Sequence, residues 1–259
     1  MEEACLNWKT RNAASEEKSD IYDGLVWQRF QKYNGKDFLI SPNNYAILIN
    51  VDWFQPFERR CDVSIGAFYG VLMNLPRNIR FKRENVLLIG IIPALDKEPK
   101  SLSSFLQPFV KDMKTFWKGV RVKTNINKDG VVVRVAVLCA AADIPAARKL
   151  CGFMGHCAAY GCSKCMKKFP GGFGEKRNYS GFHKQSWPKR TKSLHSKYVD
   201  LIQRTQTKTA RKQLESKYGC RYSVLMDLTY FDVIEHHVID PMHNLFLGTA
   251  NKCLRHGLK

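Results

Sequence analysis

Three apolar, strand-like runs follow one another closely between residues 45 and 95. They read YAILINVDWF (45–54), IGAFYGVLMNLP (65–76) and NVLLIGIIPAL (85–95), and polar residues separate each run from the next. Short runs of this kind, rich in β-branched and aromatic residues, are typical of strands that pack in a sheet. The chain is therefore predicted to build its core on a β-sheet.

Helical and extended segments alternate after these runs. Residues 101–119 place apolar side chains at helical spacing behind a serine that can cap the helix. Residues 126–143 contain an Asp-Gly turn between extended segments and then a β-branched run that ends at Asp143. A second helix is expected from residue 144, with a proline near its first turn. Strands followed by a helix, a strand and a helix predict an α/β fold.

The rest of the chain differs in composition from this core. We expect a polar lead with a short helix over residues 1–40, and the core over residues 41–150. Residues 151–222 hold a Cys/His cluster and a basic insertion with one polar helix over roughly 194–218. Residues 223–259 regain apolar character and are expected to start a further, truncated part of the core domain.

Two aspartates stand at the ends of predicted strands, Asp52 on the first and Asp143 on the last. A carboxylate between apolar neighbours is costly to desolvate unless a cation pairs with it. If the two strands are neighbours, both carboxylates leave the sheet at one edge, where they could bind Mg²⁺ through oxygen. The alternative is that Asp52 only caps a loop.

Cysteine and histidine gather in CGFMGHCAAYGCSKC, residues 151–165. Four such ligands suit tetrahedral Zn²⁺, and C-x-x-C is a frequent half-site. A zinc site with all four positions filled by protein would be structural. The alternatives are buried or incidental thiols, and a thioredoxin-like redox pair, which normally opens a helix directly after a strand. The predicted ligands are Cys151, His156, Cys162 and Cys165, with Cys157, His183 and His195 as possible replacements.

Positive charge dominates the chain, whose formal net charge is +19. Between residues 164 and 221, 16 Lys and Arg residues stand against three acids. Such a concentration favours a polyanionic partner, and nucleic acid more than a membrane surface. The candidate DNA-binding residues are Lys189, Arg190 and Lys192 in the run PKRTK, which could also act as a nuclear import signal.

The sequence does not indicate a membrane-spanning or a secreted protein. No apolar run reaches the roughly 18 residues that a membrane-spanning helix needs, and the N-terminal residues carry no apolar signal region. Nine cysteines, an odd number with five between residues 139 and 165, indicate metal binding or buried thiols before disulfides. A protein of the nucleus with no membrane partner is expected.

Several motifs, in order, resemble one known family. NVDWFQPF, NLPRNIRFKRENVLLIGIIP, ADIPAARKLCGFMGHCAAYGCSKC and IDPMHNLFLGTA are similar to the transposase domain of CACTA-type (Tnp2-like) DNA transposons, over roughly residues 20–258. The resemblance implies an RNase H-like fold with a DDE triad of acids on two Mg²⁺ or Mn²⁺ ions. It matches Asp52 to the first acid and Asp143 to the second, and it gives Asp240 and His243 as a supporting D-x-x-H motif.

The chain departs from that family in two respects. The third acid lies beyond the D-x-x-H motif in the family, but no Asp or Glu follows His243 here, and Glu235, which precedes it, is a poor substitute. We also expect this polypeptide to lack the family's N-terminal DNA-recognition region. We therefore expect a transposase-derived, DNA-binding protein that is inactive as this polypeptide, acting alone, as a homo-oligomer or with a partner transposon protein. The alternatives are a non-catalytic zinc-containing DNA-binding protein and a metal-dependent RNase H-like nuclease.

Overall fold

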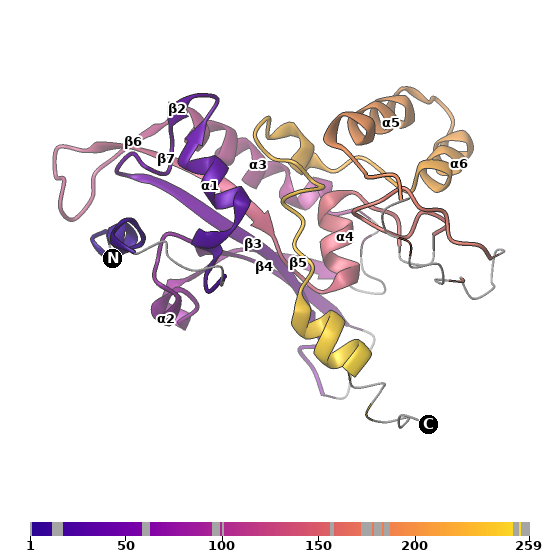
Figure 1. The fold of residues 1–259 in the computed structure, drawn as a ribbon, viewed down its shortest axis with the longest axis horizontal. Helices are drawn as coiled ribbons and strands as arrows, with labels where there is room; N and C mark the ends of the chain where they lie inside the picture. Colours follow the sequence, from indigo (N-terminus) through magenta and orange to yellow (C-terminus); the bar gives the residue numbers. More distant parts are fainter. Residues whose placement is uncertain are drawn as a thin grey trace. The chain divides into compact units, whose positions relative to one another are not determined.

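The computed structural model divides into two compact units, which are described separately (Figure 1). The first comprises Met1–Glu98 and Phe105–Ala141, and the second comprises Pro99–Ser104 and Ala142–Lys259. The domain boundaries expected from the sequence stay predictions. The structure describes residues 2–11, 18–58, 63–94, 99, 101–155, 158–171, 178, 183, 187–250 and 254.

A mixed five-stranded sheet forms the first unit (Figure 1). Its strand order is β5-β4-β3-β7-β6, in which β3 pairs in parallel with β7 and the other neighbours are antiparallel. The predicted α/β fold and its strands are confirmed. The strands are β3 (Asn44–Phe54), β4 (Ser64–Leu72), β5 (Val86–Ala94), β6 (Val120–Val122) and β7 (Val131–Ala140).

Helix α3 (Ser103–Lys118) supplies apolar side chains to the core of this unit. Phe109 packs edge-to-face against Phe68 of β4, with 5.1 Å between the ring centroids, and Val110 and Met113 are buried beside it. Full burial of one such side chain stabilises the fold by about 1.5–3 kcal/mol. The helical spacing in the sequence therefore predicted this helix correctly, although Phe105 of the same apolar pattern is exposed.

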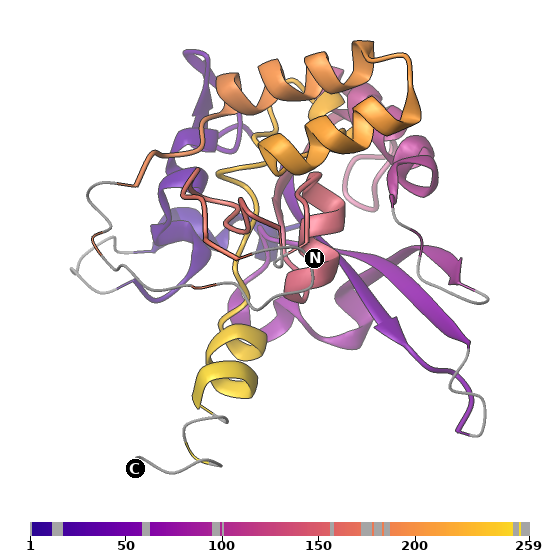
Figure 2. The ribbon, with the colours of Figure 1, turned by 90° about the vertical axis from the view of Figure 1, so that its right-hand side faces the viewer.

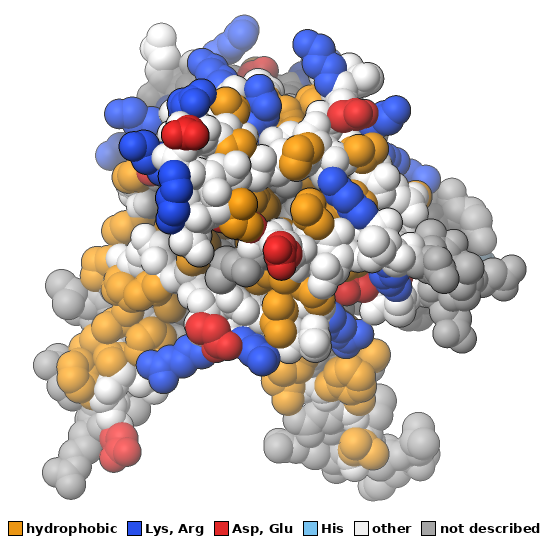
Figure 3. Space-filling view, turned by 90° about the vertical axis from the view of Figure 1, so that its left-hand side faces the viewer, with side chains coloured by type: hydrophobic (Ala, Val, Ile, Leu, Met, Phe, Trp, Pro, Cys, Tyr) orange, Lys and Arg blue, Asp and Glu red, His pale blue; other side chains and the backbone are white. Residues whose placement is uncertain are grey.

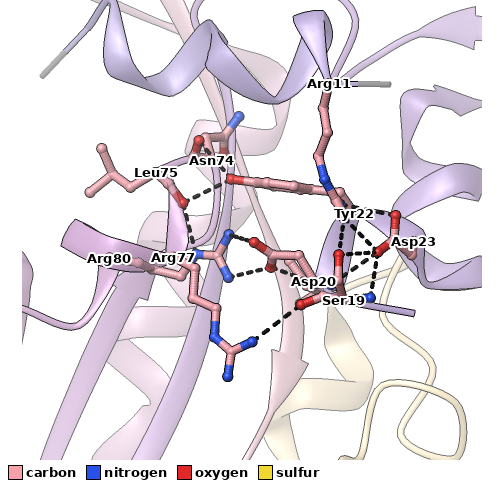
Figure 4. Close-up of polar contacts among 10 residues, drawn as sticks. Arg11, Ser19, Asp20, Tyr22, Asp23, Asn74, Leu75, Arg77 and Arg80 are labelled. Carbon is pink, nitrogen blue, oxygen red and sulfur yellow. Dashed lines mark hydrogen bonds and ion pairs between the residues drawn. The ribbon is translucent and has the colours of Figure 1, made fainter. Parts of the chain in front are cut away.

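The buried Arg80 joins Asp20, at the end of the N-terminal lead, to the rest of the first unit (Figure 4). Arg80 donates two hydrogen bonds to the carboxylate of Asp20, at 2.7 and 3.2 Å, and a third to the carbonyl of Leu75. The hydroxyl of Tyr22 donates to the carbonyls of Asn74 and Leu75. A paired and fully hydrogen-bonded charge of this kind can stay buried, whereas an unpaired one could not.

Short helical and extended elements complete the first unit. The helix expected from residue 20 is present as η2 and α1, and a further short helix, η1, lies in the described part of the lead before it. The elements are η1 (Ala4–Thr10), η2 (Ile21–Asp23), α1 (Leu25–Gln31), β1 (Lys32–Tyr33), β2 (Lys36–Asp37), α2 (Arg77–Arg80) and η3 (Arg83–Asn85).

The second unit is helical in its described part. The single polar helix predicted over residues 194–218 is two helices, which lie side by side (Figure 2). The chain leaves the first at Thr205, and the hydroxyl of Thr207 caps the second by accepting the amide N–H of Ala210. The elements are α4 (Ile144–Cys151), α5 (Lys192–Arg204), α6 (Lys208–Tyr218), η5 (Val224–Asp227) and the π-helix η6 (Met242–Ala250).

Candidate functional site

Asp52 lies near the C-terminal end of β3, opposite Ala67 of β4. Its side chain is exposed, although Val51 beside it is fully buried. The alternation of strand side chains explains the difference, because neighbouring residues point to opposite faces of a sheet. Water can solvate this carboxylate, so the expectation that only a cation could offset its desolvation is corrected. An exposed carboxylate remains available to a ligand from solution.

Asp143 follows β7 and caps the N-terminus of α4. Its Oδ1 accepts the amide N–H of Ala146 at 2.7 Å, and Pro145 stands in the first turn, where no N–H is needed. The side chain is half-buried. The cap fixes the direction of the carboxylate and leaves its second oxygen without a role in the helix.

The two strands that lead to these acids are neighbours in the sheet. Ile49 of β3 pairs with Ala140 of β7, and the amide of Ala141 donates to the carbonyl of Ile49 at 3.0 Å. The prediction of adjacent parallel strands is thus confirmed. Ile49 and Ala140 are the last residues paired between β3 and β7, and Asp52 and Asp143 each lie three positions beyond them. That the carboxylates share a site stays a prediction, because Asp52 belongs to the first unit and Asp143 to the second.

The D-x-x-H pair makes a direct contact at the start of η6. Nδ1 of His243 lies 2.6 Å from Oδ2 of Asp240, and the amide of Met242 donates to Oδ1 of the same carboxylate. Partial burial raises the pKa of Asp240, but the hydrogen bonds from His243 and Met242 outweigh burial and leave that pKa below its usual value. Asp240 therefore stays ionised and orients the His243 ring. The supporting role of this pair near the acidic site stays a prediction.

Cys162 and Cys165 lie next to each other in the second unit. The amide of Lys164 donates to Sγ of Cys162 at 3.3 Å. Burial raises the pKa of the Cys165 thiol, the backbone of Lys167 lowers it, and a hydrogen bond with Cys162 raises it. Two sulfurs that face each other and accept backbone N–H groups can form half of a metal site.

Among the described residues, no further ligand of the predicted zinc site joins Cys162 and Cys165. In the part of the chain that the structure describes, no three His, Cys, Asp or Glu side chains gather closely enough to hold a metal. Cys151 is buried, and His156 and Cys157 lie outside the described residues. His195 is buried against the ring of Phe153. The zinc ligand set stays a prediction.

The three basic candidates differ in their placement. Lys189 and Lys192 are exposed, and Lys192 also donates to the carbonyl of Thr229. Arg190 is buried, with 4% of its surface exposed, and donates to the carbonyls of Cys162 and Tyr218. A guanidinium used in this way offers no surface to a phosphate. The expectation that Arg190 contacts DNA is therefore corrected, and this residue instead joins two segments of its unit.

Two tyrosines that the sequence did not single out stack on each other in the second unit. The rings of Tyr198 and Tyr218 lie 4.0 Å apart, with 10° between their planes. The residues are 20 positions apart and occupy different helices. No local pattern could have indicated the pair, because the bend between α5 and α6 that brings the rings together was not predicted.

Positive charge is spread over the described surface. On the face that Figure 3 shows, Lys and Arg side chains are more abundant than Asp and Glu, in keeping with the net charge of +19. No described helix is both long and apolar enough to cross a membrane. A basic surface of this kind attracts polyanions, nucleic acid among them.

The chain matches a known protein family. The family described as transposase family tnp2 matches residues 18–215. That range includes both strand-end acids, the neighbouring cysteines, α5 and most of α6. It ends before the D-x-x-H pair. No curated protein matches the chain.

Proposed function

The chain belongs to transposase family tnp2, and we propose that it derives from a transposase whose DNA-cleaving site is built on Asp52 and Asp143. The observation that carries the proposal is the parallel pairing of β3 with β7. This pairing directs the carboxyl ends of the two strands the same way, and each acid lies three positions beyond the last residue paired between β3 and β7. In this proposal the sheet is RNase H-like.

The donor chemistry of the two acids fits Mg²⁺ or Mn²⁺. Asp52 is exposed, and Asp143 uses one oxygen for its helix cap and keeps the other. Hard divalent ions take carboxylate oxygens and often need only one or two of them beside a phosphate. When bound, such an ion would activate the attacking oxygen and stabilise the leaving oxygen of a phosphodiester. The role of the protein is to hold two carboxylates on rigid elements.

The proposal leaves the third acid of the family unassigned. Both carboxylate oxygens of Asp240 already accept hydrogen bonds, and this residue acts through His243. A site with two carboxylates can hold one ion, while a second ion would lack its ligand. We therefore include in the proposal that this polypeptide does not cleave DNA by itself.

DNA binding is the part of the proposed function that does not need catalysis. The family membership and the exposed Lys189 and Lys192 support it. A non-catalytic DNA-binding protein of the nucleus, with a structural zinc at Cys162 and Cys165, is the second candidate, and the contact between these two cysteines favours it. Metal analysis of freshly purified, reduced protein tests the zinc, with about one ion per chain expected and its loss expected in Cys162→Ser.

The experiment that tests the acidic site is Mn²⁺ binding, measured by electron paramagnetic resonance on the full chain. We expect a Mn²⁺ site that Asp52→Asn and Asp143→Asn each weaken, because each change removes one anionic ligand. Asp129→Asn is the matched control, because Asp129 is exposed in the turn before β7, at the opposite end of that strand from Asp143. Equal Mn²⁺ binding in wild type and Asp52→Asn would refute the site.

A strand-cleavage assay on labelled DNA tests the inactivity separately. We expect no cutting with Mg²⁺ or Mn²⁺. Metal-dependent cutting that Asp52→Asn abolishes would show that a third ligand lies within this chain, and it would support the alternative of a metal-dependent nuclease. Cutting that survives in Asp52→Asn would indicate a contaminating enzyme or another site.

A further inference from the structure

A groove of about 730 Å³ lies beside α5 and ends at α6 in the second unit. Seven residues of α5 line it, together with Tyr218, the last residue of α6. Figure 2 shows the two helices side by side. The volume falls within the range of about 300–1,000 Å³ that is usual for ligand pockets.

Aromatic rings form part of the lining. Tyr198 and Tyr218 both contribute to the groove, and their rings stack face to face at 4.0 Å. Both residues also pack against a buried cluster of Val199, Ile202 and Cys220. The cluster and the stack hold the rings in place, which limits the freedom that they lose when an aromatic ligand stacks on the outer face of the pair. The ammonium of Lys217 lies 5.4 Å from the centroid of the Tyr218 ring.

Two cations of α5, Lys197 and Arg204, line the same groove. Within the described part of the chain, neither makes a hydrogen bond or an ion pair, so both are available to an anion. One acid, Asp200, also lines the groove and leaves a small positive balance there. The helices around it add to that balance, because residues 192–218 carry seven Lys and Arg against two acids.

Unpaired nucleotides match this combination of groups. A base presents a π-face that can stack on a tyrosine, and its phosphates can contact Lys197 and Arg204. The hydroxyls of Ser193 and Ser196, which also line the groove, can donate to phosphate oxygens. In a duplex the faces of the bases are already stacked on each other, so only the cations would be used.

We propose that the groove beside α5 and α6 binds single-stranded DNA, with Tyr198 and Tyr218 as a stacking platform for unpaired bases. The choice of DNA over other polyanions rests on the proposed function. The stacked tyrosines and the two cations of the groove are observed in the structure and do not depend on the proposed function. The groove would hold strand ends or melted DNA, while duplex DNA would bind to the basic surface in general.

The test is fluorescence anisotropy on the full chain, with labelled oligo-dT and a duplex of equal length. Tyr198→Leu and Tyr218→Leu should each weaken binding of oligo-dT roughly five- to hundred-fold and leave duplex binding nearly unchanged. Lys197→Gln and Arg204→Gln should lower the dependence of oligo-dT binding on salt. An oligonucleotide with 2-aminopurine should lose fluorescence on binding to wild type but not to Tyr198→Leu.

Two controls separate stacking from folding. Tyr198→Phe keeps the ring and should bind oligo-dT like wild type. Tyr222→Leu alters a tyrosine that packs against the same buried cluster and does not line the groove. It should lower the stability of the unit as Tyr198→Leu does, without a selective loss of oligo-dT binding.

The outcomes distinguish this proposal from the proposed function. Equal losses of oligo-dT binding in Tyr198→Leu and Tyr222→Leu would overturn the proposal that the groove binds single-stranded DNA. Binding of duplex without binding of oligo-dT would overturn it too. Both results would leave the proposed function intact. Binding of neither DNA would contradict the proposed function as well. Tighter binding of oligo-rU than of oligo-dT would overturn the assignment to DNA.

Discussion

Asp143 combines a structural contact and a proposed catalytic one in a single carboxylate. Its Oδ1 accepts the N–H of Ala146 and so satisfies one of the amide groups that a helix N-terminus leaves without a partner. The same bond prevents rotation of the carboxylate. A ligand oxygen that is already oriented loses less freedom when a metal binds, which is an advantage for a site on rigid elements.

The two contacts of Asp143 can be separated by substitution. Asn is as good an N-cap as Asp, whereas Ala loses about 1 kcal/mol of stability at such a position. We expect Asp143→Asn to unfold in denaturant nearly like wild type and Asp143→Ala to be less stable by that amount. Both variants should bind Mn²⁺ more weakly than wild type. If Asp143→Asn were as unstable as Asp143→Ala, the cap would not explain the role of this residue in the fold.

Among the elements, α4 and α6 both end at a glycine in the left-handed conformation. Gly152 has φ of 74°, and Gly219 has φ of 65°. This conformation is costly for residues with a Cβ atom, and glycine adopts it readily. At Gly152 the surroundings add a second restriction, since a Cβ atom there would stand 2.4 Å from the carbonyl oxygen of Arg221.

Substitution of Gly152 by Ala is therefore expected to cost more than the conformation alone. The left-handed conformation accounts for about 1–2 kcal/mol, and the clash with a backbone oxygen adds to it because the backbone must move. Gly35→Ala is the matched control, with φ of 76° and no atom within 4 Å of the new Cβ. Thermal unfolding should show a clearly larger loss for Gly152→Ala. Equal losses would mean that the segment around Arg221 moves freely.

The sequence predicted those elements whose apolar pattern is continuous. The three strands were found as short apolar runs rich in β-branched and aromatic residues, α3 by the helical spacing of its apolar residues, and α4 by the proline near its first turn. The division between α5 and α6 was missed because α6 buries none of its residues, and its polar pattern continues that of α5. Thr207 was the available signal, as a threonine that can cap a new helix.

The candidate site was predictable to the same extent as the strands. The positions of Asp52 and Asp143 at strand ends came from the apolar runs that contain or precede them, and these positions suggested a shared metal site. The resemblance to a family gave the two acids their catalytic role. For the candidate site residues, the sequence did not predict which side chains are buried. Arg190 stands in a basic run like its neighbours, yet it is buried by contacts with residues 28 positions away in either direction. Distant contacts of this kind leave no mark in a local pattern.

At the scale of the whole molecule, positive charge and buried histidines make the protein sensitive to acid. The net charge is already +19 at pH 7 and rises as carboxylates and histidines are protonated. Burial, and then Arg190, lower the pKa of His195 to about 4. Burial, and then Lys164 and Arg148, do the same for His237. Both rings are therefore neutral in the folded protein at neutral pH.

The buried His195 fixes the sign of the pH dependence. An unfolded histidine has a pKa near 6.5, so between about pH 6.5 and pH 4 the unfolded chain binds the proton and the folded chain does not. The contribution of His195 to the free energy of unfolding is therefore full above that window and falls as the pH is lowered through it, by up to about 3 kcal/mol in total.

His195→Leu removes the titrating group, and it also removes two ring nitrogens that find no hydrogen-bond partner among the described residues. We expect denaturant unfolding of His195→Leu to match or exceed wild-type stability at pH 7 and to lose less of it by pH 5. His183→Leu, at an exposed position, controls for the rise in net charge, which affects both variants equally. A slope in His195→Leu as steep as in wild type would show that the acid sensitivity arises from other groups.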